Sequence, residues 1–202
     1  MRWMTAILLL AAATWASSPA HAQSLPAYLL SPAEIERFRG EAGGFSNIVA
    51  HRDAEQRGPL WRVIRNVTGA LHGKVVGGRG PILELFYNGI NGPPEKLSIE
   101  RERFLVGAAT RHQSRSEGAI YIIDMKTGHV AVGVNYPARP YQEWFRDGKA
   151  VLVTKDCANA ELRDFAAERY RRWIETEYKR APNEYTMLPP MTTRCASASK
   201  PK

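Results

Sequence analysis

An aspartate and a histidine stand five residues apart at a predicted tight turn, and together they have the residue types of an acid–base pair. Asp124 ends the apolar run 119–124, and His129 begins the run 129–134. A short link ending in Gly128 joins the two runs, which predicts a β-hairpin with this glycine in a left-handed conformation. In such a turn an aspartate accepts hydrogen bonds from nearby backbone N–H groups. We therefore interpret Asp124 as a turn residue rather than as a catalytic acid.

A second group of potential ligands lies in the segment His51-Arg52-Asp53-Ala54-Glu55, which contains one histidine and two carboxylates. Metal sites usually draw their ligands from more than one segment and hold them in a defined geometry. His72, His112 and His129 offer no matching spacing elsewhere in the chain. We therefore interpret the segment as part of a polar loop, and we predict no metal site.

The glycine-rich segment 69–80 (GALHGKVVGGRG) has the composition of a phosphate-binding loop but not its spacing. The Gly73-Lys74 pair comes one residue too early after Gly69, and Val75 stands where a hydroxyl residue would bind magnesium. The segment is better interpreted as a connector. The sequence predicts no cofactor.

Positive charge is concentrated in the same region, because no acidic residue occurs between Gln56 and Leu83. The basic residues form either an ordinary solvated face or a patch that attracts anions. The candidates for such a patch, which begins near Arg57, are Arg62, Arg65, Lys74 and Arg79.

One predicted loop, residues 111–116, is polar and basic and joins two predicted strands. Loops on a rigid sheet often hold binding residues, although a surface turn without a role is the alternative. Its candidate contact residues are Arg111, His112 and Arg115.

A second predicted loop, residues 88–96, is dense in turn-forming residues. The pair Pro93-Pro94 stiffens it, and a stiff loop loses less conformational entropy when it binds a partner. Its candidate contact residues are Asn91 and Lys96.

The first 22 residues have the pattern of a secretory signal peptide. Arg2 supplies a positive start, residues 6–13 form an apolar run, and Ala20-His21-Ala22 provides the small residues that a signal peptidase recognises. A retained membrane anchor is the alternative, but a bilayer span needs about 20 apolar residues. We expect cleavage after Ala22 and a protein that is exported, either periplasmic or secreted.

Cys157 and Cys195 are the two cysteines of the chain. An even number of cysteines in an oxidising compartment indicates a disulfide. We therefore predict a Cys157–Cys195 disulfide, with free thiols or an intermolecular bridge as the alternatives. A closed loop of this size gains about 4 kcal/mol in the chain-entropy model.

The chain carries 28 basic and 20 acidic residues, a formal net charge of +8. Without residues 1–22, whose one charged residue is Arg2, 27 basic and 20 acidic residues remain, a net charge of +7. An excess of positive charge favours anionic partners, such as an acidic protein or an anionic envelope polymer. We do not expect nucleic acid as the partner. No transmembrane span is predicted after residue 22, and the oligomeric state stays open.

Two helices are predicted before the first strand. Ser31 can cap a helix that starts at Pro32, contains Glu34 as the second half of a capping box, and ends at Gly40. Residues 40–58 are expected to form a loop. A second helix is predicted from residue 59 to about residue 71, because its apolar residues recur at helical spacing: Leu60, Val63, Ile64, Val67 and Leu71.

From Pro81 onward the apolar pattern predicts strands over residues 82–87, 103–110, 119–124, 129–134, 141–146 and 150–154. Short links between them predict an antiparallel meander, because parallel pairing needs long crossover connections. A long helix is predicted over residues 159–180, and its apolar stripe needs a partner. The stripe consists of Leu162, Phe165, Ala166, Tyr170, Trp173, Ile174 and Tyr178.

These elements predict an α+β fold. An antiparallel β-meander of five or six strands packs against a long C-terminal helix and one or two N-terminal helices. Residues 23–195 form a single domain, and residues 196–202 form a disordered tail.

The sequence lacks the Gly-x-Ser-x-Gly, His-Glu-x-x-His and Cys-x-x-Cys motifs. We therefore favour a non-catalytic, exported binding protein, such as an inhibitor or an immunity-type protein that binds a protein partner in the cell envelope. A binder of anionic polymers or membrane surfaces is one alternative. The other is a cell-envelope hydrolase, which would need distant residues to converge in one cleft: Glu84, His112, Asp124 and His129.

Overall fold

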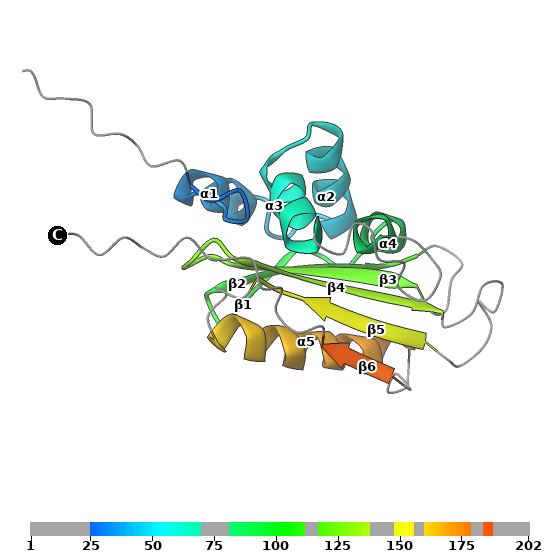
Figure 1. Cartoon of the computed structure of the whole chain (residues 1–202). Coiled ribbons are helices and arrows are strands. Elements are labelled where there is room, and N and C mark those ends of the chain that lie inside the picture. Colours follow the sequence, from blue (N-terminus) through cyan, green and yellow to red (C-terminus); the bar gives the residue numbers. More distant parts are fainter. Residues whose placement is uncertain are drawn as a thin grey trace, which may run out of the picture.

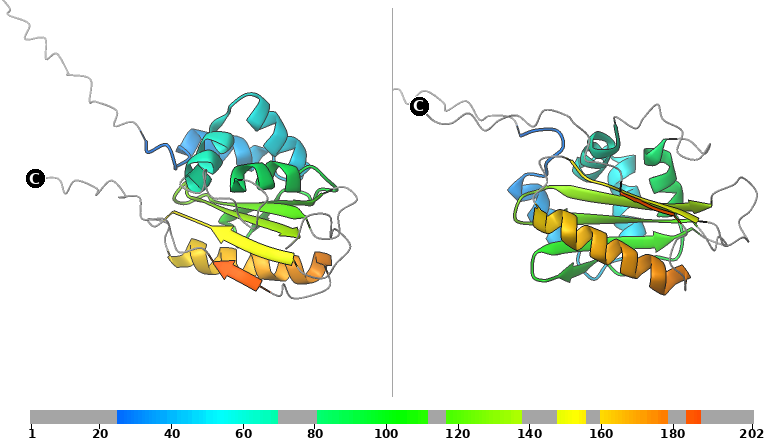
Figure 2. Two further views of the ribbon diagram at one scale, coloured as in Figure 1. Left: turned by 45° about the vertical axis from the view of Figure 1, so that its right-hand side comes forward. Right: turned by 60° about the horizontal axis from the view of Figure 1, so that its bottom comes forward.

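A β-sheet lies between two helical layers in the computed structural model of the chain (Figure 1). The structure describes residues 25–69, 81–111, 117–137, 148–155, 160–178 and 184–187. Within these ranges, four short helices cover one face of the sheet and one long helix covers the other (Figure 2). The α+β fold expected from the sequence is confirmed, with helices on both sides of the sheet.

The strands lie side by side in chain order. They are β1 (Ser98–Glu100), β2 (Phe104–Thr110), β3 (Gly118–Asp124), β4 (Val130–Pro137), β5 (Gly148–Val153) and β6 (Glu184–Met187). Strands β1 to β5 form an antiparallel meander, as predicted, although β1 is not among the strands expected from the sequence. Strand β6 pairs with β5 in parallel. The parallel pairing is possible because α5 (Ala160–Tyr178) crosses between the two strands.

Helix α5 packs its apolar stripe on one face of the sheet, as predicted. Leu162, Phe165 and Tyr170 are buried in a cluster with residues of the strands, among them Ile120 and Ile122 of β3. The rings of Phe165 and Phe104 of β2 stack with their centroids 4.1 Å apart. Trp173 and Ile174 continue the same cluster.

The other face of the sheet is covered by α1 (Pro32–Gly40), α2 (Ser46–Glu55), α3 (Pro59–Thr68) and α4 (Ile82–Gly89). Alternate residues of β3, such as Tyr121 and Ile123, point into this second cluster. Because helices cover both faces, the whole of β3 is buried. This explains why its sequence is a continuous apolar run.

The two helices predicted near the N-terminus are present. Helix α1 starts with the predicted capping box, in which the Glu34 N–H donates to Ser31 Oγ over 3.3 Å and the Ser31 N–H donates to Glu34 Oε2 over 2.7 Å. Helix α3 buries the predicted stripe of Leu60, Val63 and Ile64, with Val67 one turn later.

Residues 82–87 form part of helix α4, so the strand predicted there is wrong. Ile82 and Phe86, four residues apart, are both fully buried on one side of this helix. A run of six residues with apolar side chains at most positions fits the periods of both a strand and a helix. The packing against the sheet selects the helix.

The loop expected over residues 40–58 contains helix α2, so this prediction is also wrong in part. The buried face of α2 consists of Ser46, Val49, Ala50 and Asp53, which have helical spacing. Only one of them is a large apolar residue, so the apolar pattern of the sequence is too weak to reveal the helix.

Several expectations from the sequence lie outside the described residues, among them the signal peptide (1–22), the strand at 141–146, the Cys157–Cys195 disulfide and the tail 196–202. Within the described ranges, no helix has both the length and the apolar character needed to cross a bilayer.

Candidate functional site

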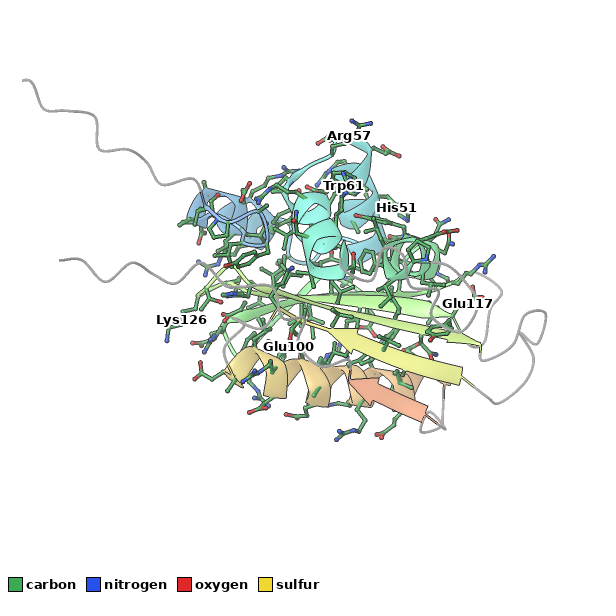
Figure 3. All side chains as sticks on the ribbon, in the orientation of Figure 1. His51, Arg57, Trp61, Glu100, Glu117 and Lys126 are labelled. Atoms are coloured by element: carbon green, nitrogen blue, oxygen red, sulfur yellow. The ribbon has the colours of Figure 1, made fainter. Side chains whose placement is uncertain are left out.

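The sheet has two ends with different connections. At one end β2 stops and β3 begins, and β4 stops and β5 begins, since Thr110 pairs with Gly118 and Pro137 pairs with Gly148. We call this end the loop pole. The opposite end holds the tight β3–β4 turn and is called the turn pole. Figure 3 shows Glu117 and Lys126 at these two opposite ends.

Helix α4 ends at the loop pole, where its last residue contacts the start of β3. A Cβ added at Gly89 would lie 2.6 Å from the backbone carbon of Gly118, so only glycine permits this approach. The close contact places Leu85 and Asn88 beside the ends of β2 and β4.

A small pocket opens at the loop pole, with a volume of about 70 Å³. Its walls are Leu85 and Asn88 of α4, Arg111 and Glu117 next to β2 and β3, and Asn135 and Tyr136 of β4. One water needs about 10–15 Å³ of such space, so the pocket is large enough for several waters or a small polar group.

The predicted contact residue Arg111 lies on the wall of this pocket. Its backbone N–H donates to the Glu117 carbonyl over 2.8 Å, and its guanidinium forms an ion pair with the buried Glu117 carboxylate. The Arg111 side chain is 45% exposed, so it faces both the pocket and the solvent. His112 and Arg115 lie outside the described residues.

The second predicted loop runs along the outer edge of β2. The Thr110 N–H donates to the Pro93 carbonyl over 3.2 Å, and the Glu95 N–H donates to the Ala108 carbonyl over 2.8 Å. These bonds place residues 91–93 at the loop pole, on the side where Arg111 follows β2. Asn91 and Lys96 are both exposed.

The start of α2 is fixed to this same loop. Phe45 forms an isolated antiparallel bridge with Lys96, and the Asn47 side-chain amide donates to the Gly92 carbonyl over 3.3 Å. Two large apolar side chains at the start of α2 are exposed to solvent: Phe45 is 51% exposed and Ile48 is 56% exposed. We call Phe45, Ile48 and Lys96 the anchor patch.

The basic residues of the stretch 57–79 have different environments in the structure. Arg62 donates to the carbonyls of Ala27 and Leu29 over 3.0 and 3.1 Å, and it pairs with Glu34 at 3.1 Å. It therefore fastens the segment before α1 to α3. Arg65 is exposed, with its guanidinium 5.1 Å from the ring centroid of Trp61. Lys74 and Arg79 lie outside the described residues.

Asp124 has the role in the turn that the sequence predicts. Its carboxylate accepts the Lys126 N–H over 3.0 Å and the Thr127 hydroxyl over 2.8 Å. Arg103 adds two further bonds of 2.8 Å. Gly128 has a φ of +76°, which is the expected left-handed conformation. This confirms that Asp124 is a turn residue held by several donors.

The Asp124 backbone N–H donates to the His129 carbonyl over 2.9 Å. Both side chains contact the Thr127 hydroxyl, which lies 3.1 Å from His129 Nδ1 and donates to the Asp124 carboxylate. Burial lowers the pKa of His129, partly offset by the charge of Asp124. Glu84, another residue of the hydrolase alternative, lies on α4, whose end contacts the opposite end of β3. Strand β3 has seven residues and so spans roughly 20 Å. Of the residues proposed for a hydrolase, Glu84 therefore does not share a cleft with Asp124 and His129, and His112 is outside the described residues.

Asp53, from the predicted polar loop, has a structural role instead. It is fully buried, and its Oδ2 accepts the Trp61 N–H over 2.7 Å, which caps the first turn of α3. Arg37 lies 3.7 Å from its Oδ1. Desolvation raises the pKa of Asp53 despite these contacts. In the described part of the chain, no three His, Cys, Asp or Glu side chains gather into a group that could hold a metal ion.

Sequence reasoning did not single out Glu117, Phe45 or Ile48. Glu117 sits at the start of an apolar strand, which is a weak sign of a special role. Exposed apolar residues cannot be told from core residues by type alone, because their exposure depends on the tertiary structure.

Comparison of the chain with protein-family models, with curated proteins and with solved structures finds no match. The function must therefore be argued from the residues of the loop pole and the anchor patch.

Proposed function

We propose that this protein is an exported, non-catalytic binding protein of the inhibitor or immunity type, which binds a protein partner in the cell envelope. The observation that carries the proposal is the arrangement around β2. Asn91 and Arg111 lie at the loop pole, and Lys96 lies beside the exposed Phe45 and Ile48. Arg111 and the segment 91–96 thus both border β2.

The mixture of side chains supports a protein as the partner. Protein interfaces combine apolar anchors at the centre with polar groups around them. Here Phe45 and Ile48 supply apolar surface, Asn91 and Lys96 supply hydrogen bonds and charge, and Arg111 supplies a half-exposed guanidinium that is paired with Glu117. The rigid sheet and the stiff Pro93-Pro94 pair limit the entropy lost on association.

The observations give less support to the two alternatives. A hydrolase needs its acid, base and nucleophile in one cleft, and Glu84 lies near the opposite end of the sheet from Asp124 and His129. A binder of anionic polymers needs cations that are free to meet phosphates or carboxylates, and Arg62 is already bonded to Glu34 and to two backbone carbonyls.

The test is a pull-down from envelope extract of the source cells with the mature protein, at low and at moderate salt. We expect one stoichiometric protein partner that survives moderate salt. Its capture should be lost in Arg111→Ala and in the double variant Phe45→Ser, Ile48→Ser. Leu25→Ser is the matched control, because Leu25 is also 50% exposed but precedes α1 near the turn pole.

Two outcomes would contradict the proposal. Recovery of only polymers or lipids that are lost as salt rises would indicate electrostatic binding to an anionic polymer or membrane. Capture that is unchanged in the Arg111 and Phe45–Ile48 variants would show that the partner binds elsewhere on the molecule.

A further inference from the structure

The anchor patch shows which chemistry its partner must present. Phe45 and Lys96 form a bridge pair, so their side chains project on the same side of the backbone pairing, with Cβ atoms about 5 Å apart. Ile48 lies in the first turn of α2, directly after the N-cap Phe45. The bridge therefore places the Lys96 ammonium group beside the exposed Phe45, and Ile48 adds a second exposed apolar side chain at the start of the same helix.

Lys96 differs from the charged residues around it. Glu95 and Glu100 of the same segment both pair with Arg169 of α5, at 3.0 and 2.6 Å. Among the described residues Lys96 has no such ion pair, and it is exposed. Its charge is thus available to an external carboxylate, whereas the two neighbouring carboxylates share one guanidinium within the protein.

We propose that the anchor patch binds an acidic, apolar segment of a protein partner, in which a large apolar side chain lies on Phe45 and Ile48 while a carboxylate pairs with Lys96. The inference rests on the proposed function, because it names the contact chemistry of that partner. The net charge of +8 acts in the same direction, since it attracts an acidic protein over longer distances.

A protein segment fits the patch better than an anionic membrane does. Membrane surfaces attract clusters of cations, each contributing about 1 kcal/mol. The anchor patch has a single cation, Lys96, and two carboxylates of the same segment, Glu95 and Glu100, remain 32% and 26% exposed. One cation in a segment with two carboxylates gives an anionic surface little attraction, whereas one carboxylate of a protein segment can pair with Lys96.

The first experiment titrates the ¹⁵N-labelled mature protein with three synthetic peptides of equal length that alternate leucine with aspartate, with lysine or with serine. We expect saturable shifts at the amides of Phe45, Ile48 and Lys96 with the leucine–aspartate peptide, and much weaker shifts with the other two. Equal shifts with all three, or shifts that avoid the patch, would overturn the proposal.

Charge reversal gives the sharper test. Lys96→Glu should weaken binding of the leucine–aspartate peptide about tenfold and make the leucine–lysine peptide the preferred ligand. Lys126→Glu is the matched control, because Lys126 is also exposed but lies at the turn pole (Figure 3), and it should leave the preference unchanged. An unchanged preference in Lys96→Glu would contradict the pairing with Lys96.

Two further measurements exclude other occupants. Sedimentation of the protein alone should show no self-association through the anchor patch. Self-association that Phe45→Ser abolishes would mean that a second copy of the protein occupies the patch. Vesicles of anionic phospholipid should not shift the amide resonances of Phe45, Ile48 and Lys96. A shift of these resonances would mean that a lipid surface occupies the patch. If the peptide tests fail while envelope extract still yields a partner that depends on Arg111, only the chemistry assigned to the patch is wrong.

Discussion

The ring of Tyr121 occupies the space where a side chain of Gly107 would begin. A Cβ added to Gly107 would lie 2.3 Å from Cζ of Tyr121, its partner across the β2–β3 pair. Tyr121 is fully buried, and its hydroxyl donates to the Ser46 carbonyl at the start of α2 over 3.2 Å. The glycine thus allows one aromatic ring to connect the sheet to the helix that carries the anchor patch.

Replacing Gly107 by alanine should therefore destabilise the protein. The added methyl group must displace the ring of Tyr121, and overpacking of this kind costs about 1–3 kcal/mol. Urea unfolding gives the free energy for comparison with Gly40→Ala, a position where an added Cβ meets nothing within 4 Å. A cost at Gly107 no larger than that at Gly40 would show that the ring moves aside freely.

The elements with long, regular patterns could be predicted from the sequence. Helix α5 was predictable because its apolar stripe repeats over 19 residues, with large side chains such as Phe165 and Trp173. The short elements were not. The β1–β2 turn places Arg101 and Glu102 at φ values of +52° and +55°, where glycine or asparagine is usual. Its sequence therefore contains no sign of a turn.

The candidate site could be predicted only in part, because its geometry depends on contacts between distant segments. Composition was enough to select Arg111 as a loop residue. It could not show that Arg62 meets the carbonyls of Ala27 and Leu29, which precede it by more than 30 residues. Nor could it show that Phe45 remains exposed, since that depends on how the loop at 91–96 pairs with β2.

Asp53 should give the protein a characteristic dependence of stability on pH. Burial raises its pKa in the folded state above the value of about 3.9 in the unfolded chain. The folded state therefore binds this proton more tightly, and the resulting stabilisation, present at low pH, is lost as the pH rises through the folded pKa. Asp53→Asn keeps an acceptor for the Trp61 N–H but has no charge.

We expect the free energy of unfolding of Asp53→Asn, relative to the wild type, to increase as the pH rises from about 4 to 7. Urea unfolding of both proteins across this range measures the difference. A constant difference, or one that decreases with pH, would mean that the pKa of Asp53 is not raised in the folded protein.

Gly58 and Asp53 should be energetically coupled. A Cβ at Gly58 would lie 2.2 Å from Asp53 Oδ1, although its φ of −73° suits any residue. Gly58→Ala should therefore displace the carboxylate that caps α3, at a cost of about 1–2 kcal/mol. In the Asp53→Ala background the same substitution should cost much less. A double-mutant cycle measures the coupling, and purely additive costs would exclude the clash.

The ion pair between Asp124 and Arg103 should matter for stability and not only for the shape of a turn. The Asp124 carboxylate is fully buried and accepts two bonds from the Arg103 guanidinium, whose side chain is 18% exposed. These bonds hold Arg103 firmly in its charged form and raise its pKa. Removal of Arg103 leaves the buried Asp124 carboxylate without its counter-charge, which costs about 3–5 kcal/mol.

Arg103→Leu should therefore lower the free energy of unfolding by an amount in that range, because it leaves the buried carboxylate unpaired. Asp124→Asn should also destabilise the protein but by less, because Arg103 keeps its ion pair with Glu161. The double variant should be less destabilised than the two single costs added together, since neither charge is then left alone. Urea unfolding of the four proteins measures the cycle. If Asp124→Asn proves as stable as the wild type, the turn does not depend on this carboxylate, and a role for Asp124 outside the fold would have to be sought.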